Sequence, residues 1–419
     1  MSALLQSGTF RQLWAGLFLA QLGNQLFLVV VPWVVLDLSG SSLTLSLVLV
    51  AASLPRLLLT PWAGTLADRH GPTSLLISSN GARSAVLLVM LLAVLNSNNT
   101  TWLILVSAAY GAASAFHSPA SGSVLPYYLS QERIPAANAL VLTSYDLGVF
   151  LGRTTGALLV ATLFGLGSLW SGANLALLTN AATFLLATLI FRFVGKSNEV
   201  APKDSSVEAD SGGLGDAIAY LIQRPLLFLL FCFVVGSFFI HTGPLLIALP
   251  VLAKYQSGSN PGFSYSIYAA CYGLGAMCGS LCAGFIWKPA NAWLLPVLIT
   301  LSLISTILTL IIGFLESYLP TGLAVLSISL IFNYSYTVVA SWLQMNTPER
   351  ILGRVMSLFI LGTQGIMPVS MALTGYVIRT DARLIFLVLG SLGVVISLMT
   401  LSRYLQLAHK DKSLETKYD

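Results

Sequence analysis

The chain has 419 residues, of which 56% are hydrophobic and only 8% are charged. A water-soluble domain carries roughly 25% charged residues, so this composition excludes a soluble globular protein. Four cysteines, Cys232, Cys271, Cys278 and Cys282, all lie within apolar runs. A metal or redox role is conceivable for the last two, but small apolar packing residues are the favoured interpretation, and no disulfide framework is implied.

Twelve apolar stretches are each about as long as a helix needs to cross a hydrocarbon core of roughly 30 Å. They cover residues 12–36, 43–63, 74–95, 102–126, 137–164, 169–194, 226–252, 264–287, 292–314, 319–344, 353–377 and 383–405. The first stretch is too long for the core of a signal peptide and is soon followed by another, so we expect a retained helix. The chain is therefore predicted to be an all-α membrane protein.

A charged, serine-rich segment at 195–216 interrupts this pattern and is typical of a solvated linker. It separates six apolar stretches from the following six, which indicates two six-helix bundles, a common plan among transporters. We predict an N-terminal bundle at 1–194, a cytoplasmic linker at 195–225, and a C-terminal bundle with a short cytoplasmic tail at 226–419.

Lysine and arginine residues near the helix ends predict the orientation. With the N-terminus inside, fourteen of them fall on the inner side and three on the outer side, namely Lys254, Arg379 and Arg383. We therefore expect a multi-pass protein of the plasma (inner) membrane with both termini and the linker in the cytoplasm. The basic net charge of +5 then reflects membrane topology and not a nucleic-acid surface.

The loop between the second and third stretches contains Gly64, Asp68, Arg69 and Gly71. This spacing on the cytoplasmic side resembles the signature loop of the major facilitator superfamily. The resemblance implies that the aspartate accepts hydrogen bonds from the N-terminus of helix 11. This contact would latch the two halves of the protein together on the inner side. A helix N-terminus favours an anion, so this role is physically sensible.

Helix 11 is expected to open at residues 353–357, where Arg354 completes the predicted latch. The second basic cluster of the family loop is absent, because Pro72 and Thr73 follow Gly71. The matching loop of the second half, around Lys288, lacks the acid. These departures predict a weaker latch than is usual in the family.

Residues 116–126 and 137–140, together with 353–357, look like helices 4, 5 and 11 of an exporter branch of the superfamily. That branch includes macrolide-efflux, enterobactin-export and lysophospholipid transporters. The resemblance implies two six-helix bundles that work by alternating access. It predicts secondary active export of an amphipathic small molecule such as a drug, a siderophore or another secondary metabolite.

Helix 5 departs from the antiporter pattern of the superfamily. Gly148, Gly152 and Gly156 keep the glycine spacing, which predicts close helix packing, but Arg153 stands where a proline is common. Proton-coupled antiport is therefore left open by the sequence. Asp146 lies in the same stretch, and a charge deep in a bilayer calls for an explanation.

Two interpretations of Asp146 remain. It is either a proton carrier whose switchable partner is Arg153 or Arg56, or a member of a static buried pair that fixes helices together. His117 and His241 are further candidates for a coupling group, because histidine titrates near neutral pH. The candidate coupling residues are therefore Asp146, Arg153, Arg56, His117 and His241.

In the family, helices 1, 4, 7 and 10 line the central cavity. Each of the matching stretches carries polar or aromatic residues at helical spacing, which favours a cavity over isolated hydrogen bonds between helices. The candidate cavity residues are Gln21, Asn24, Gln25, Tyr110, Ser114, His117, Ser237, Phe238, His241, Asn333, Tyr336 and Gln344. Amides, phenols and imidazoles suit a sizeable ligand with polar and apolar parts.

No glycine-rich nucleotide loop or catalytic motif is found in the sequence, so neither an enzyme nor a cofactor is predicted. The expected partners are a small-molecule substrate, protons and the lipid bilayer, with the chain acting as a monomer. Two alternatives remain open: a lipid or lysolipid transporter, and a membrane sensor that keeps the fold without transporting.

Overall fold

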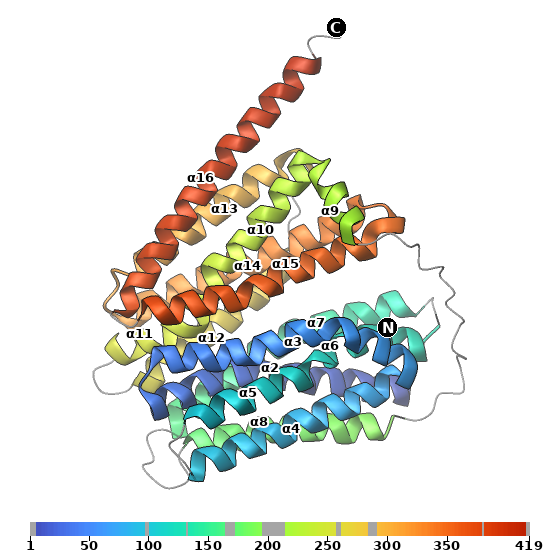
Figure 1. Ribbon diagram of the computed structural model, residues 1–419, viewed down its shortest axis with the longest axis vertical. Helices are drawn as coiled ribbons and strands as arrows, with labels where there is room; N and C mark the ends of the chain where they lie inside the picture. Colours follow the sequence, from blue (N-terminus) through green and yellow to red (C-terminus); the bar gives the residue numbers. More distant parts are fainter. Residues whose placement is uncertain are drawn as a thin grey trace. The chain divides into compact units, whose positions relative to one another are not determined.

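The computed structural model describes residues 6–96, 100–130, 133–163, 172–194, 214–256, 261–283, 291–378 and 381–415. Within these ranges the chain is almost entirely helical and contains no strand (Figure 1). The predicted all-α architecture is confirmed. Each of the twelve predicted stretches contains a helix, although the number of membrane crossings remains a prediction.

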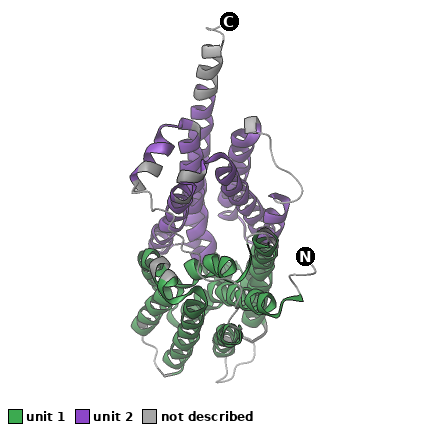
Figure 2. Cartoon of the chain, turned by 90° about the vertical axis from the view of Figure 1, so that its right-hand side faces the viewer, with its two compact units in different colours: residues 1–207, 249–273 green, residues 208–248, 274–419 purple. Residues whose placement is uncertain are grey.

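The chain divides into two compact units, coloured separately in Figure 2. Unit 1 comprises residues 1–207 and 249–273, and unit 2 comprises residues 208–248 and 274–419. The helices that begin in unit 1 are α2 (Gly8–Ser39), α3 (Ser42–His70), α4 (Pro72–Asn96), α5 (Thr100–Ala115), α6 (His117–Tyr128), α7 (Ile134–Leu163) and α8 (Gly172–Arg192), followed later in the chain by α11 (Leu249–Gln256) and α12 (Pro261–Leu281). The last eight residues of α12 belong to unit 2.

Unit 2 begins with α9 (Leu214–Ile222). Its other elements are α10 (Pro225–Gly243), a π-helical turn η1 (Pro244–Ala248), α13 (Asn291–Ile312), α14 (Tyr318–Asn346), α15 (Glu349–Val377) and α16 (Ala382–Glu415). Unit 1 therefore includes α11 and the first part of α12, which follow the linker in the chain. The sequence instead predicts that the linker separates the two bundles. The predicted bounds of the two bundles stay a prediction.

Serine residues and glycine residues define the ends of the first helices. Ser7 and Ser41 cap α2 and α3, because each side-chain oxygen accepts from a backbone N–H of the first turn. Gly40 and Gly71 follow the two helices with φ of 62° and 80°, a region that costs other residues steric strain. Capping serines and glycines therefore mark the ends of these helices.

Nine helical segments within the described ranges are long and apolar enough to cross a membrane. Large apolar side chains remain exposed on them, including Leu58 (57% exposed), Leu323 (64%) and Met399 (67%). Water would disfavour such surfaces, whereas lipid tails accommodate them. The chain is thus a multi-pass membrane protein.

Two predicted helices are interrupted in the structure. The stretch predicted at 102–126 forms α5 and α6, with a break at Phe116. The stretch predicted at 226–252 forms α10, η1 and α11, because Pro244 has no N–H for the helical ladder and the chain passes through a π-helical turn. Apolar composition predicts these spans but not their internal breaks.

The linker and the start of helix 11 also differ from prediction. Residues 214–222 form the short helix α9, in which Leu221 is buried while Ile218 and Ile222 are exposed. The helix was missed because a charged, serine-rich segment precedes it. Helix 11 corresponds to α15, which begins at Glu349 after Pro348, so Gly353 lies inside the helix and does not open it.

Candidate functional site

Arg83 forms the centre of a polar network inside unit 1. Its side chain is fully buried in α4, where Nη1 donates to Oδ1 of Asn24 at 2.7 Å and Nη2 donates to Oδ1 of Asn80 at 2.6 Å. The guanidinium also lies 4.3 Å from the centre of the Phe184 ring. Neutral acceptors and an aromatic face therefore hold this charge, and among the described residues no carboxylate pairs with it.

The predicted residues of helices 1 and 4 lie around this network. The Asn24 amide donates to Oε1 of Gln21 at 3.4 Å, so both amides of α2 belong to the same chain of hydrogen bonds. Tyr110 of α5 stacks on Phe27, with ring centres 3.8 Å apart, and Ser114 donates to the Tyr110 carbonyl. His117 begins α6, and its buried Nδ1 makes no hydrogen bond to any residue that the structure describes.

The three glycines of α7 all face α2. A Cβ added at Gly148 would lie 3.0 Å from Cγ of Gln21, and one added at Gly152 would lie 2.7 Å from Cβ of Gln25. At Gly156 the corresponding neighbour is Val29, at 3.1 Å. The glycine spacing therefore lets the two helix backbones approach closely.

Arg153 contacts neutral groups and not Asp146. Its Nε donates to Oε1 of Gln25 at 2.9 Å, and its guanidinium lies 3.7 Å from the centre of the Tyr272 ring of α12. Asp146 lies two helical turns earlier, half-buried and with interactions of its own. Arg56, the other predicted counter-charge, is an exposed residue of α3. Arg153 is thus held by neutral neighbours and needs no carboxylate partner to be explained.

A small aromatic pocket in unit 1 lies between α2 and α7. It has about 200 Å³ of space free of atoms, part of it open to solvent. The Nε1 of Trp14 donates to Oγ of Ser144 at its edge. The lining residues are Trp14, Leu17, Phe18, Gln21, Val141, Ser144 and Tyr145. Of these only Gln21 is among the residues predicted from the sequence.

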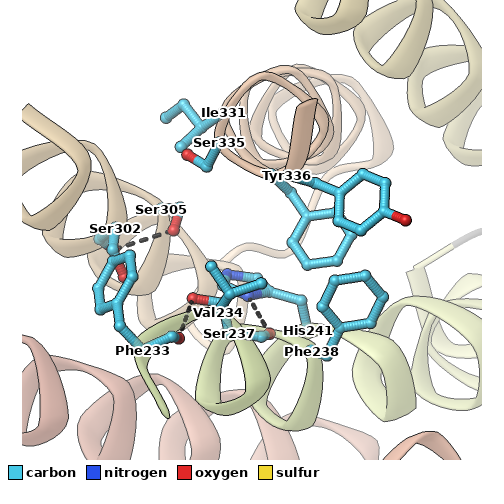
Figure 3. A pocket seen from close by; sticks show the side chains of 11 residues that line it. Phe233, Val234, Ser237, Phe238, His241, Ser302, Ser305, Ile331, Ser335 and Tyr336 are labelled. Atoms are coloured by element: carbon cyan, nitrogen blue, oxygen red, sulfur yellow. Dashed lines mark hydrogen bonds between the residues drawn. The ribbon is translucent and has the colours of Figure 1, made fainter. Parts of the chain in front are cut away.

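Unit 2 contains a larger pocket, which we call the serine–histidine pocket (Figure 3). It has about 320 Å³ of space free of atoms, part of it open to solvent, and lies between α10, α13 and α14. Its residues are Phe233, Val234, Ser237, Phe238, His241, Ser302, Ser305, Ile331, Phe332, Ser335 and Tyr336. Polar side chains from three helices therefore converge in an otherwise apolar bundle.

The structure brings together only part of the predicted set in unit 2. Ser237, Phe238, His241 and Tyr336 line the serine–histidine pocket. Asn333 instead donates to the Ser329 carbonyl of its own helix at 2.9 Å, and Gln344 is exposed near the end of α14. The sequence prediction missed Ser302 and Ser305 of α13, although two serines three residues apart in an apolar run share one helix face.

The predicted latch residues are only partly described. Gly64 and Asp68 belong to α3, but the Asp68 side chain lies outside the described residues. Arg69 is exposed in the last turn of α3, and the N–H of Gly71 donates to the Ala67 carbonyl at 3.0 Å. Arg354 is half-buried in the second turn of α15. The latch therefore stays a prediction.

Comparison with known proteins defines the class of this protein. The family model described as Major Facilitator Superfamily matches residues 13–368, which is most of the chain. The protein therefore belongs to the major facilitator superfamily, as its helices and the loop around Asp68 indicate.

Individual relatives are more distant. The multidrug efflux pump Tap of Mycolicibacterium fortuitum is 24% identical over 212 residues, covering 49% of this chain and 50% of the relative. The protein of the same name from Mycobacterium tuberculosis is 26% identical over 205 residues, covering 47% and 48%. The chain thus spans about half the length of the curated relatives it matches.

Solved structures agree on the fold. The nucleoside transporter NupG superposes with a TM-score of 0.72 at 13% identity, covering 95% of this chain and 99% of that one. A bacterial homologue of the human lysosomal transporter Spinster, inward-facing and occupied, gives 0.72 at 14% identity, covering 96% of each chain. At these identities the likeness extends to the fold and not to the substrate.

Proposed function

We propose that this protein is a secondary transporter that exports an amphipathic small molecule across the plasma (inner) membrane. The serine–histidine pocket carries this proposal, because it combines aromatic walls with several hydroxyls and one imidazole inside an apolar bundle. Concave, mostly apolar sites with a few placed polar groups are typical of small-molecule binding. The relatives named multidrug efflux pumps support export of drug-like compounds.

The mechanism we infer is alternating access between two six-helix bundles joined by a cytoplasmic linker. The N-terminus, the linker and the C-terminus would then all be cytoplasmic, in agreement with the distribution of lysine and arginine. Asp68 and Arg354 would act in the latch on that side. The substrate would be handled by a monomer without a cofactor.

Proton coupling is the second part of the proposal, and Asp146 is its best candidate. Arg153 is engaged by Gln25 and Tyr272, so a permanent Asp146–Arg153 pair is not needed to explain Arg153. A carboxyl group within a span must be stabilised by its surroundings or take up a proton, and either state suits a carrier that exchanges a proton for substrate.

Flux measurements in proteoliposomes test the proposed function. The purified chain is reconstituted with a fluorescent amphipathic amine inside the vesicles, and release is followed with and without an imposed pH gradient. Protein-dependent release that the gradient accelerates is expected. Binding of the dye without any release would favour a membrane sensor, and movement of a labelled lysolipid in place of the dye would favour the lipid-transporting alternative.

A further inference from the structure

The hydrogen-bonding state of His241 can be read from its neighbours. Its Nδ1 lies 2.9 Å from the backbone carbonyl oxygen of Ser237, one turn earlier in α10. Because a carbonyl oxygen accepts and cannot donate, Nδ1 must carry the hydrogen. The pocket lining includes no acidic residue, so a charged imidazolium would be an unpaired buried charge, which is costly. The ring is therefore neutral.

The other nitrogen of this ring is consequently an acceptor. The His241 side chain is 2% exposed, and its Nε2 makes no hydrogen bond within the described residues. The backbone of Ser305 also acts on this ring, but no group within the described residues donates a hydrogen bond to Nε2. A buried acceptor without a donor costs free energy, which a ligand that donates recovers.

Two serines near His241 direct their hydroxyl hydrogens to backbone carbonyls and not to the imidazole. Ser237 donates its hydroxyl to the Phe233 carbonyl at 3.0 Å, and Ser305 donates to the Ser302 carbonyl at 2.9 Å (Figure 3). The Ser302 hydroxyl shares a hydrogen bond of 3.2 Å with the Ser397 hydroxyl. A hydroxyl has a single hydrogen to donate, so Ser237 and Ser305 leave Nε2 of His241 without a donor.

Aromatic rings enclose the same space. The ring centre of Phe238 lies 4.7 Å from that of Phe332 and 5.6 Å from that of Tyr336. The His241 ring centre lies 5.7 Å from that of Phe332. A planar group between these rings gains apolar and edge-to-face contacts. Part of the space between these side chains is open to solvent.

We propose that the serine–histidine pocket selects a planar aromatic group that carries a hydrogen-bond donor, a hydroxyl or an amine N–H, and that Nε2 of His241 accepts from this donor. The proposal rests on the proposed function, since it names the chemistry of the substrate. A matching group without the donor hydrogen leaves Nε2 unsatisfied and binds more weakly.

A matched pair of small probes tests this selection. 2-Naphthol and 2-methoxynaphthalene share one ring system, but the methoxy compound has no hydrogen to donate. Their dissociation constants are measured by equilibrium dialysis against the full-length purified chain in detergent, with empty micelles as the blank. One hydrogen bond to a buried acceptor is expected to make naphthol bind roughly tenfold more tightly.

Variants of His241 assign this preference to Nε2. His241→Phe should bind both probes with equal affinity, whereas His241→Gln should retain a preference for naphthol, because an amide can donate to the Ser237 carbonyl and still present an oxygen. His70→Gln, a change at an exposed histidine of α3, should retain the wild-type preference. Thermal unfolding curves confirm that each variant is folded before it is compared.

The outcomes separate this proposal from the proposed function. Equal binding of both probes by the wild-type chain, as expected if an ordered water satisfies Nε2, would overturn it. A preference that survives in His241→Phe would also overturn it. If His241→Phe does not fold, loss of preference in folded His241→Gln decides against an acceptor role. A chain that discriminates between the probes but releases no dye from proteoliposomes would overturn export and leave the selection intact.

Discussion

Nη1 of Arg83 donates to Oδ1 of Asn24 at 2.7 Å and so connects α4 to α2 inside unit 1. The same guanidinium donates to Asn80 and lies over Phe184. A planar group with several donors in a fixed fork makes these contacts simultaneously, whereas an ammonium group cannot. The network therefore depends on arginine itself and not only on a positive charge.

The first prediction follows from this geometry. Arg83→Lys should lower the free energy of unfolding by about 1.5–3 kcal/mol, because it keeps the charge but leaves at least one buried amide oxygen without its donor. Thermal unfolding of the purified protein in detergent measures the change. Arg11→Lys, at an exposed position of α2, should leave the unfolding temperature unaltered. Equal stability of both variants would show that the fork geometry contributes little.

The second prediction concerns the close approach of α7 and α2. Gly152→Ala places a Cβ 2.7 Å from Cβ of Gln25 and 2.8 Å from the Leu22 carbonyl, so one helix must move. We expect a loss of about 1–3 kcal/mol of stability, as for other overpacked sites. Because both helices carry polar residues of the candidate site, dye efflux should fall as well.

A matched glycine provides the control for this change. Gly122 lies in α6, and a Cβ added there meets no atom within 4 Å. Gly122→Ala should therefore stabilise the protein by about 0.5–1 kcal/mol, since alanine is the better helix former. If the two substitutions had the same effect, close packing at Gly152 would not be what the glycine provides.

The sequence predicts the spans and the glycine face because each depends on local composition or on helical spacing. A run of about twenty apolar residues indicates a transmembrane helix without any information on its neighbours. Glycines four residues apart lie on one face of a helix. The breaks at Phe116 and Pro244 depend on neighbouring helices, which must form hydrogen bonds with backbone groups that the break leaves unpaired. Near Pro244, for example, the Gly243 N–H donates to the Ser370 hydroxyl. Such compensation is not visible in a single segment.

The site was harder to predict for a related reason. A polar stripe indicates which helix face is unusual, but not whether its side chains bond to their own backbone or face a pocket. Asn333 and His241 both lie on predicted stripes. Asn333 donates to the Ser329 carbonyl, whereas Nε2 of His241 makes no hydrogen bond in the described part of the chain. Only the packing of α13 against α10 and α14 distinguishes the two cases.

The third prediction tests the contact between Arg153 and Tyr272. A double-mutant cycle with Arg153→Gln and Tyr272→Leu should give a coupling energy of about 0.5–2 kcal/mol, the range of partly desolvated cation–π pairs. Tyr272→Phe retains the ring and should remain coupled to Arg153. Strict additivity of the two single changes in unfolding experiments would mean that the guanidinium gains nothing from the ring.

The fourth prediction concerns Asp146 as the coupling group. Asp146→Asn keeps the shape and most hydrogen bonding of the side chain but cannot release or take up a proton. If Asp146 carries the coupled proton, the variant loses dye efflux driven by a pH gradient yet still binds dye and exchanges it at equilibrium. Asp37→Asn, at an exposed position near the end of α2, should pump like the wild type.

The contacts of Arg153 sharpen the choice between a coupling and a structural role. Because Arg153 is held by Gln25 and Tyr272, neutralising it should not restore function to Asp146→Asn. Rescue of either membrane insertion or efflux in the Asp146→Asn, Arg153→Gln double variant would instead establish a buried pair whose charges must balance. An Asp146→Asn protein that folds and responds normally to the pH gradient would remove this residue from the coupling mechanism, and His117 would then be the next residue to test by the same exchange assay.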